Sequence, residues 1–106
     1  MQRPIRIKFP PFVVDVVELG AVEADKAYGA YYSETHQIKL RPSFATKQLH
    51  AETLFHEVLH GAWDFAGLNP KDGEEKIISA LSKQLCAVIQ HNPELIQWLT
   101  EALKPE

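Results

Sequence analysis

The hydrophobic residues of this 106-residue chain repeat with two different periods, and the switch between them restricts the fold more than any other feature. Up to about residue 40 they alternate with polar residues or form short β-branched runs, as in PIRIKF, FVVDVVEL, AYGAYYS and QIKL. Such runs are typical of strands. From about Thr46 the apolar residues recur every three or four positions, which is typical of amphipathic helices. We therefore predict an α+β fold in which a small sheet of three or four strands, antiparallel or mixed, precedes the helices.

Turn residues separate the predicted strands, and a cap residue limits the first helix. Pro10-Pro11 breaks the first strand, GAVEADKAYG is expected to form a loop, and ETH is expected to form a turn before QIKL. The first helix has about twenty residues, and Gly67 stands where a C-terminal cap belongs. Its apolar positions are Leu54, Phe55, Val58, Leu59, Ala62, Trp63 and Ala66.

A second helix is predicted to run antiparallel to the first. Asn69 is expected as its N-cap, with Pro70 and Asp72 in its first turn, and it continues to about Gln90. The stretch PELIQWLTEAL then predicts a last, short helix. The apolar stripe of the second helix consists of Ile77, Ile78, Leu81, Leu85, Val88 and Ile89.

The composition is that of an ordinary globular protein and argues against several classes. Apolar residues make up 45% and charged residues 24%, which argues against disorder. The net charge of −3 gives no reason to expect nucleic acid or an anionic membrane as a partner. The lone Cys86 fits a reducing compartment, and neither a signal peptide nor a run of about 18 apolar residues is present. We therefore expect one cytoplasmic domain over residues 1–106, and the sequence leaves its oligomeric state open.

The stretch TLFHEVLHGAW carries the pattern His-Glu-x-x-His within the first predicted helix. Residues four apart share a helix face, so His56 and His60 can direct imidazole nitrogens at one zinc ion. Glu57 lies about 100° round the helix, where it can take a proton from a water held on zinc and pass it to a leaving amine. The alternative is an amphipathic helix with ordinary polar residues, because so short a pattern also arises by chance. Histidines with a carboxylate favour zinc over iron or manganese.

A peptidase site of this kind needs a third protein ligand, and Glu74 and Glu75 are the candidates. If the two helices form an antiparallel hairpin about Gly67, both glutamates come opposite His60. Glu74 shares the centre of the apolar stripe, whereas Glu75 lines up with small polar residues that could approach the first helix closely. The sequence favours Glu75 slightly and leaves Glu74 open, and either could simply be a first-turn glutamate that suits the helix dipole.

Other residues are candidates for lesser roles. Asp64, one turn beyond His60, is better placed to support a ligand than to be one. Tyr28, Tyr31 or Tyr32 could stabilise an oxyanion, although packing is the simpler role. Solvated or structural roles are expected for His36, His50 and His91, an inert core position for Cys86, and core anchors for Trp63 and Trp98.

The motif and its surroundings bear a resemblance to a known group of proteins. TLFHEVLHGAWDFAGL, followed by EEKIISALSKQLCAVIQHNPELIQWL, resembles small zincin-like proteins of phages and prophages, which are similar to minimal gluzincins and, more loosely, to ImmA/IrrE-type metallopeptidases. YGAYYSETHQIKL is similar to the strand pair ahead of their active-site helix, so the resemblance covers roughly residues 28 to 100. It implies zinc held by His56, His60 and a glutamate matching Glu74 or Glu75, with Glu57 as general base. The gap between His60 and that glutamate is shorter here than in longer gluzincins.

Two functions follow as expectations. The first is a zinc-dependent peptidase of narrow specificity, with Glu57 as general base and the strand QIKL pairing with an extended protein or peptide substrate. By analogy with the ImmA group, that substrate would be a phage or host regulator. The second is a zinc-stabilised regulatory or binding module with little or no catalysis. A small interaction domain without metal is the remaining alternative.

Overall fold

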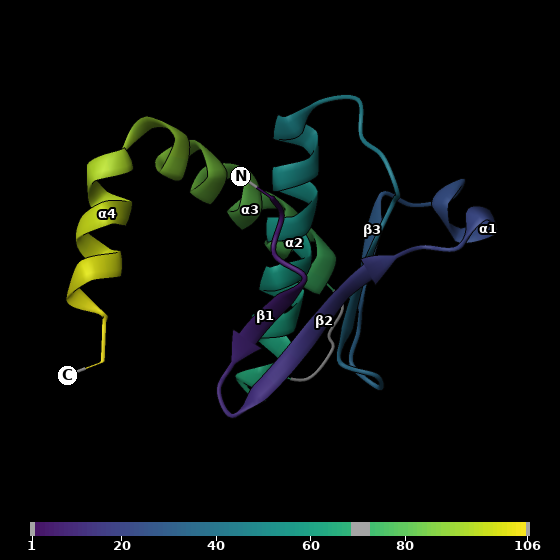
Figure 1. Cartoon of the computed structure of the whole chain (residues 1–106), viewed down its shortest axis with the longest axis horizontal. Helices are drawn as coiled ribbons and strands as arrows, with labels where there is room; N and C mark the ends of the chain where they lie inside the picture. Colours follow the sequence, from purple (N-terminus) through teal and green to yellow (C-terminus); the bar gives the residue numbers. More distant parts are fainter. Residues whose placement is uncertain (1, 69–72, 106) are drawn as a thin grey trace.

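A computed structural model describes residues 2–68 and 73–105 of the chain and shows a four-stranded sheet followed by helices (Figure 1). The predicted α+β class and its order of elements are confirmed. The expectation that GAVEADKAYG forms a loop is partly wrong, because this segment contains a single helical turn. The elements are β1 (Arg6–Phe9), β2 (Phe12–Glu18), α1 (Ala21–Ala24), β3 (Gly29–Tyr32), β4 (Gln37–Leu40), α2 (Lys47–Phe65), α3 (Glu74–His91) and α4 (Pro93–Ala102).

The sheet is mixed, with the strand order β1-β2-β4-β3. β1 pairs antiparallel with β2, β2 pairs parallel with β4, and β3 pairs antiparallel with β4. The strand QIKL is therefore β4, which has a paired strand on each side. The expectation that QIKL pairs with a substrate is wrong, because both of its edges already carry ladder hydrogen bonds. The edge strand on that side of the sheet is β3.

The core lies between the two central strands and α2. Val14, Val16, Ile38 and Leu40 are buried, and they alternate along their strands with residues on the other face of the sheet. The side chains that pack against this cluster come from β1, β3, the loop before α2, and α2 itself, and they are Ile7, Phe9, Tyr31, Phe44, Leu54, Val58 and Phe65. One face of α2 is thus fixed against the sheet, which leaves its other faces for the site and for α3.

Both ends of α2 are capped, and the cap at Gly67 is the one that the sequence predicts. The Thr46 side chain accepts a hydrogen bond from the Leu49 N–H at 3.0 Å. At the other end Gly67 has φ +80, and its N–H donates to the Asp64 carbonyl, while the Leu68 N–H donates to the Trp63 carbonyl. These two bonds form a Schellman motif, for which glycine is favoured because side chains rarely adopt positive φ. The expected end of the helix at Gly67 is confirmed.

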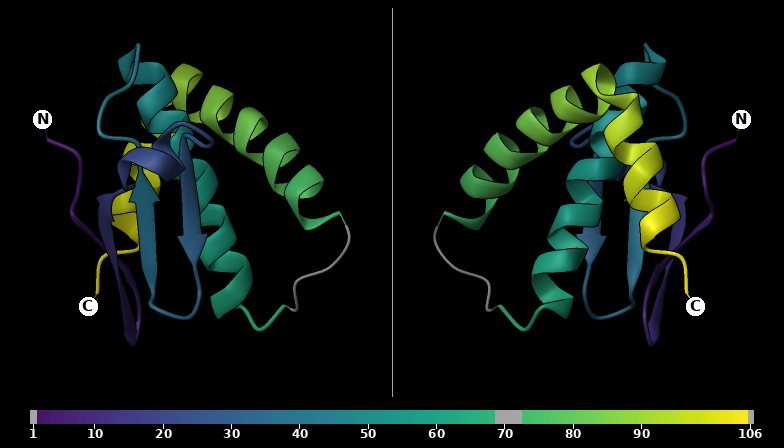
Figure 2. Two further views of the ribbon diagram at one scale, coloured as in Figure 1. Left: turned by 90° about the vertical axis from the view of Figure 1, so that its right-hand side faces the viewer. Right: turned by 90° about the vertical axis from the view of Figure 1, so that its left-hand side faces the viewer.

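The second predicted helix is present but shorter than expected. α3 begins at Glu74, directly after Gly73, which has φ +95. The expected cap and first-turn residues Asn69, Pro70 and Asp72 lie outside the described residues. α3 runs back along α2 at an incline, and α4 follows after a bend (Figure 2). The antiparallel arrangement of the two long helices is as predicted.

The apolar stripe of α3 is the largest departure from the sequence analysis. Ile78 is the only one of its six residues that is buried, because α2 contacts α3 on the side of Ile78 and Ser82 and leaves the centre of the stripe uncovered. Trp98, expected as a core anchor, is 66% exposed, so that expectation is wrong. In the part of the chain that the structure describes, no helix combines the length and the hydropathy needed to cross a membrane.

Candidate metal centre

Two histidines of α2 bring their Nε2 atoms to within 3.2 Å of each other. His56 and His60 are one turn apart, so both rings project from the face of α2 that looks toward α3 and β3. The two side chains are largely covered, with 22% and 13% of their surfaces exposed. The spacing predicted two imidazoles aimed at one point, and the structure has them so arranged.

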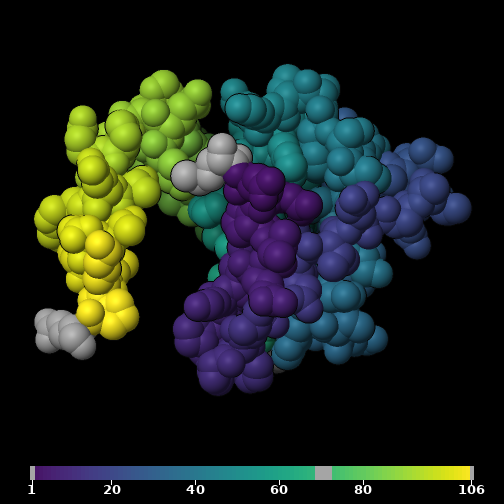
Figure 3. Space-filling view, in the orientation of Figure 1, coloured from purple at the N-terminus to yellow at the C-terminus, as the bar shows by residue number. Residues whose placement is uncertain are grey.

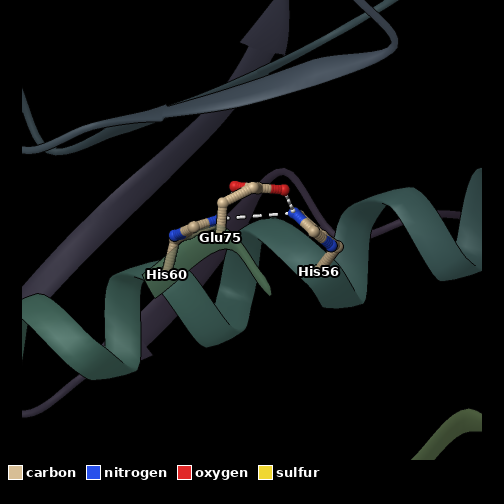
Figure 4. Close-up of side chains that lie close together, drawn as sticks. All are labelled: His56, His60 and Glu75. Atoms are coloured by element: carbon tan, nitrogen blue, oxygen red, sulfur yellow. Dashed lines mark hydrogen bonds and ion pairs between the residues drawn. The ribbon is translucent and has the colours of Figure 1, made fainter. Parts of the chain in front are cut away.

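Glu75 completes this group from the first turn of α3 (Figure 4). Its Oε1 lies 2.8 Å from His56 Nε2, and its Oε2 lies 2.8 Å from His60 Nε2. The Ser79 hydroxyl donates to Oε1 at 3.3 Å. The ligand atoms of the two histidines and Glu75 all lie within 4.8 Å of one another. Of the two glutamates that the sequence left open, Glu75 is the one at the histidine Nε2 atoms.

Glu74 has a different position, behind His60. Its Oε2 lies 2.7 Å from His60 Nδ1, on the far side of the ring from Glu75. The Glu74 side chain is 19% exposed, compared with 70% for Glu75. A carboxylate on Nδ1 fixes the tautomer and the orientation of an imidazole whose Nε2 faces a metal. The two consecutive glutamates thus contact opposite nitrogens of one ring.

The arrangement fits a small divalent cation. Four ligands placed tetrahedrally at about 2.1 Å from zinc lie about 3.4 Å from one another. The separations found here, 3.2 Å between the nitrogens and 2.8 Å from each nitrogen to Glu75, require an opening of a few tenths of an ångström. Two imidazoles and a carboxylate are a donor set that zinc accepts, with the fourth position left for water or substrate.

Glu57 lies beside this group and is buried. Only 6% of its surface is exposed, which is unusual for a carboxylate. Burial raises its pKa from the ordinary 4.5 to about 7; the charge of His60 and a hydrogen bond from the Tyr31 main chain oppose the rise, and the charge of Glu75 adds to it. A carboxyl group with a pKa near 7 is suited to take up and release a proton near neutral pH.

Tyr31 and Asp64 join the edge strand to the site helix. The Tyr31 hydroxyl donates to Asp64 Oδ2 at 2.6 Å, and burial, this bond and the charge of Asp64 all raise the pKa of the tyrosine. Gly61 permits the contact of helix and strand here, since a Cβ on it would lie 3.0 Å from Phe9 Cζ and 3.5 Å from Tyr31 Cε1. Asp64 is therefore not among the three converging ligands, in line with the supporting role expected for it. No local pattern pairs Tyr31 with Asp64, which is 33 residues away.

Two open cavities flank the group of His56, His60 and Glu75. The first has a volume of about 390 Å³ and extends on the His60 side toward Tyr31 and Asp64. The second, of about 320 Å³, extends on the other side toward Tyr28 and Lys83. Both are lined by Gly29, His56, Glu57 and Glu75, so they meet at the candidate metal centre. Strand β3 runs along both, which makes the pair a continuous cleft between the edge of the sheet and α3.

The remaining candidates lie away from the three ligands. The rings of His36 and His50 pack against phenylalanines, and His91 is exposed at the end of α3. Tyr28 stacks on Phe44, and Tyr32 lies under Lys39. Cys86 is partly buried, and burial raises its pKa, so an activated thiolate is not favoured.

Comparisons of the chain with models of protein families, with curated proteins and with solved structures found no match. The resemblance to phage-type zincins therefore depends on the motif and its surroundings alone.

Proposed function

We propose that this protein is a zinc-dependent peptidase of narrow specificity, of the zincin type that phages and prophages encode. One observation carries the proposal: two imidazole Nε2 atoms and the Glu75 carboxylate converge on one point, beside a buried carboxyl group. The alternative, that these are ordinary solvated polar residues, does not explain the convergence. Both histidines are mostly covered, and Glu57 is buried.

His56, His60 and Glu75 would hold the metal, and Glu74 would orient His60 through Nδ1. When bound, zinc supplies a Lewis acid that polarises a peptide carbonyl and acidifies water. The proton chemistry belongs to Glu57. It accepts a proton from the attacking water and transfers it to the leaving amine, and its raised pKa allows both steps near pH 7. The Tyr31 hydroxyl donates a hydrogen bond to Asp64 Oδ2, so we assign it to holding β3 against α2, not to the oxyanion.

The substrate is expected to be an extended segment of a protein. Among the described residues no strand pairs with the outer edge of β3, and this edge follows the cleft. An extended peptide could add to β3 as a further strand, with its scissile bond at the metal. The cleft is open, so binding of one partner has to draw on contacts beyond the segment in the cleft, such as pairing with the edge of β3. A regulator in the cytoplasm would suit this role, and the lone cysteine is in keeping with that compartment.

A specific observation favours a second function, a zinc-stabilised binding module. Of the residues of α3, only Ile78 and Ser82 are buried, whereas Glu74 and Glu75 make short contacts with the histidines of α2. A metal at this point would therefore attach α3 to the rest of the molecule. Stabilisation by metal and catalysis do not exclude each other, so cleavage must be tested separately.

The first experiment measures zinc by mass spectrometry in the purified wild type and in His60→Ala, with His50→Ala as the matched control. We expect close to one zinc per chain in the wild type and in the control, and none in His60→Ala. A protein that is purified without metal and does not bind zinc on titration would contradict both functions.

The second experiment incubates the wild type and Glu57→Gln with a digest-derived peptide library and with intact host or phage proteins. Cleavage is expected to fall at least 100-fold in the variant while its zinc content is retained. Equal cleavage by both proteins would refute Glu57 as the base. Zinc binding without cleavage of any substrate by the wild type would favour the binding module.

A further inference from the structure

Exposed large apolar residues are concentrated on α3 and on α4 with its C-cap, which carry nine of the sixteen such residues in the described part of the chain. We call residues 74–104, which comprise both helices and the turn after them, the arm. Nine of its large apolar residues are between 36% and 78% exposed. They are Ile77, Leu81, Leu85, Val88, Ile89, Leu95, Trp98, Leu99 and Leu103.

These residues form ridges. Ile77, Leu81, Leu85 and Ile89 follow one another at intervals of four along α3, and Leu95, Leu99 and Leu103 do so along α4 and its C-cap. Rows of residues four apart are the ridges that interdigitate in the commonest class of helix packing. Both helices of the arm thus present the surface by which helices pack in protein interiors, and both present it to solvent.

The other elements that the structure describes do not cover this surface. Within the described residues, α3 is the only element with which α4 makes extended contact. The space-filling view shows an open gap between the lower part of α4 and the strands (Figure 3). The arm is attached to α2 along another face of α3, the face of Glu75, Ile78 and Ser82.

From this we propose that the arm is the interface of a symmetric dimer, in which the arm of a second copy of this chain packs on the first. The area is the main reason: with about 200 Å² for a fully exposed large side chain, the nine residues present on the order of 900 Å². A standard interface takes about 800 Å² from each partner. A single chain seldom leaves so large an apolar surface uncovered.

The chemistry of the arm suits a copy of itself. In a two-fold interface the same patch occurs on both sides, so it must be complementary to itself. Apolar ridges meet this condition, because rows of residues four apart can interdigitate with the same rows of a second copy. Charge does not oppose the contact, because the arm contains four glutamates and three lysines. The ridges lie on a different face of α3 from Glu75, so the dimer leaves the candidate metal centre open.

Sedimentation equilibrium over a range of protein concentrations tests the proposal. The wild type is expected to sediment at twice the 12.0 kDa chain mass and to dissociate on dilution. Leu81→Glu/Leu99→Glu places two charges on the ridges and is expected to give a monomer. Ala87→Glu/Gln97→Glu adds the same charge at exposed positions away from the ridges and is expected to remain a dimer. Circular dichroism checks that each variant keeps its helices.

A wild type that is monomeric at 0.2 mM would overturn the proposal, as would an open-ended series of larger assemblies. A ridge variant that dimerises as tightly as its control would overturn it too. If Leu81→Glu/Leu99→Glu does not fold, Leu103→Glu serves instead, since Leu103 is 78% exposed and its replacement disturbs no core. Zinc content is measured on the same samples, so the loss of the dimer and the loss of the metal centre are separate results.

Discussion

The two helical regions of this protein both carry apolar stripes and bury them to very different extents. The body, which consists of the sheet and α2, covers Leu54, Val58 and Phe65 of α2 with the central strands. The arm leaves most of the stripe of α3 and nearly all of α4 exposed. An apolar stripe thus predicts that one face of a helix is covered, but it does not identify the element that covers it. In the body this partner is the sheet, and for the arm we propose a second copy.

The largest effect expected from this difference is on stability. Ile38 is completely buried between the strands and α2, so Ile38→Ala should lower the free energy of unfolding by about 2–5 kcal/mol. Leu81 is half exposed in the single chain, so Leu81→Ala should cost less than about 0.5 kcal/mol where the protein is monomeric. Urea unfolding at low micromolar concentration measures both. Equal losses would mean that the arm packs as tightly as the body.

The second effect is the pH dependence of stability that Glu57 causes. Glu57 lies on α2, where the body contacts the arm. Its pKa is about 7 in the folded protein and near 4.5 in the unfolded chain, so the folded state holds this proton more tightly. The stabilisation is complete below pH 4.5 and is lost as pH rises through 7, with a total of roughly 3 kcal/mol in the metal-free protein. Unfolding at pH 5 and pH 8 in the presence of a chelator measures it.

The matched variant for this effect is Glu57→Gln, which has the shape of the protonated side chain and does not titrate. The difference in stability between the wild type and this variant should grow in favour of the variant as pH rises from 5 to 8. If the difference in unfolding free energy between the two proteins does not change with pH, burial does not raise the pKa of the Glu57 carboxyl group.

The third effect concerns Glu74, at the contact of arm and body. Removing a carboxylate that orients a metal-bound histidine costs about 10–100-fold in metal affinity, and we expect this of Glu74→Ala. Glu74→Gln keeps an oxygen that accepts a hydrogen bond from Nδ1, so it should lose less. Competition with a chromophoric chelator gives the zinc affinity. Glu94→Ala, in the first turn of α4, is the control. If Glu74→Ala binds zinc with wild-type affinity, His60 is oriented by packing and not by Glu74.

Features that depend on residues close together in the sequence were predictable, and features that join distant segments were not. Local patterns predicted the class of fold, the cap at Gly67 and the shared face of His56 and His60, because each depends on residues within a turn or two. For the third metal ligand the sequence left two candidates, Glu74 and Glu75. Which of them faces the histidine Nε2 atoms depends on where α3 begins after Gly73 and on how α3 is rotated against α2. The pairing of β2 with β4, and of Tyr31 with Asp64, joins distant segments and has no local pattern.

The smallest effect contrasts how the two long helices begin. α2 starts with a side-chain cap, in which Thr46 accepts a hydrogen bond from the Leu49 N–H, whereas α3 starts at Gly73 without a side-chain cap. Thr46→Ala should therefore lower the free energy of unfolding by about 1 kcal/mol, and Thr46→Ser should be close to neutral because it keeps the hydroxyl. Thermal unfolding of both variants beside the wild type measures the difference. In the first turn of α3, Glu74 and Glu75 instead contact the histidines of α2. An unchanged stability in Thr46→Ala would show that packing on the sheet alone sets the start of α2, and the contrast between the two helices would then concern only what covers them.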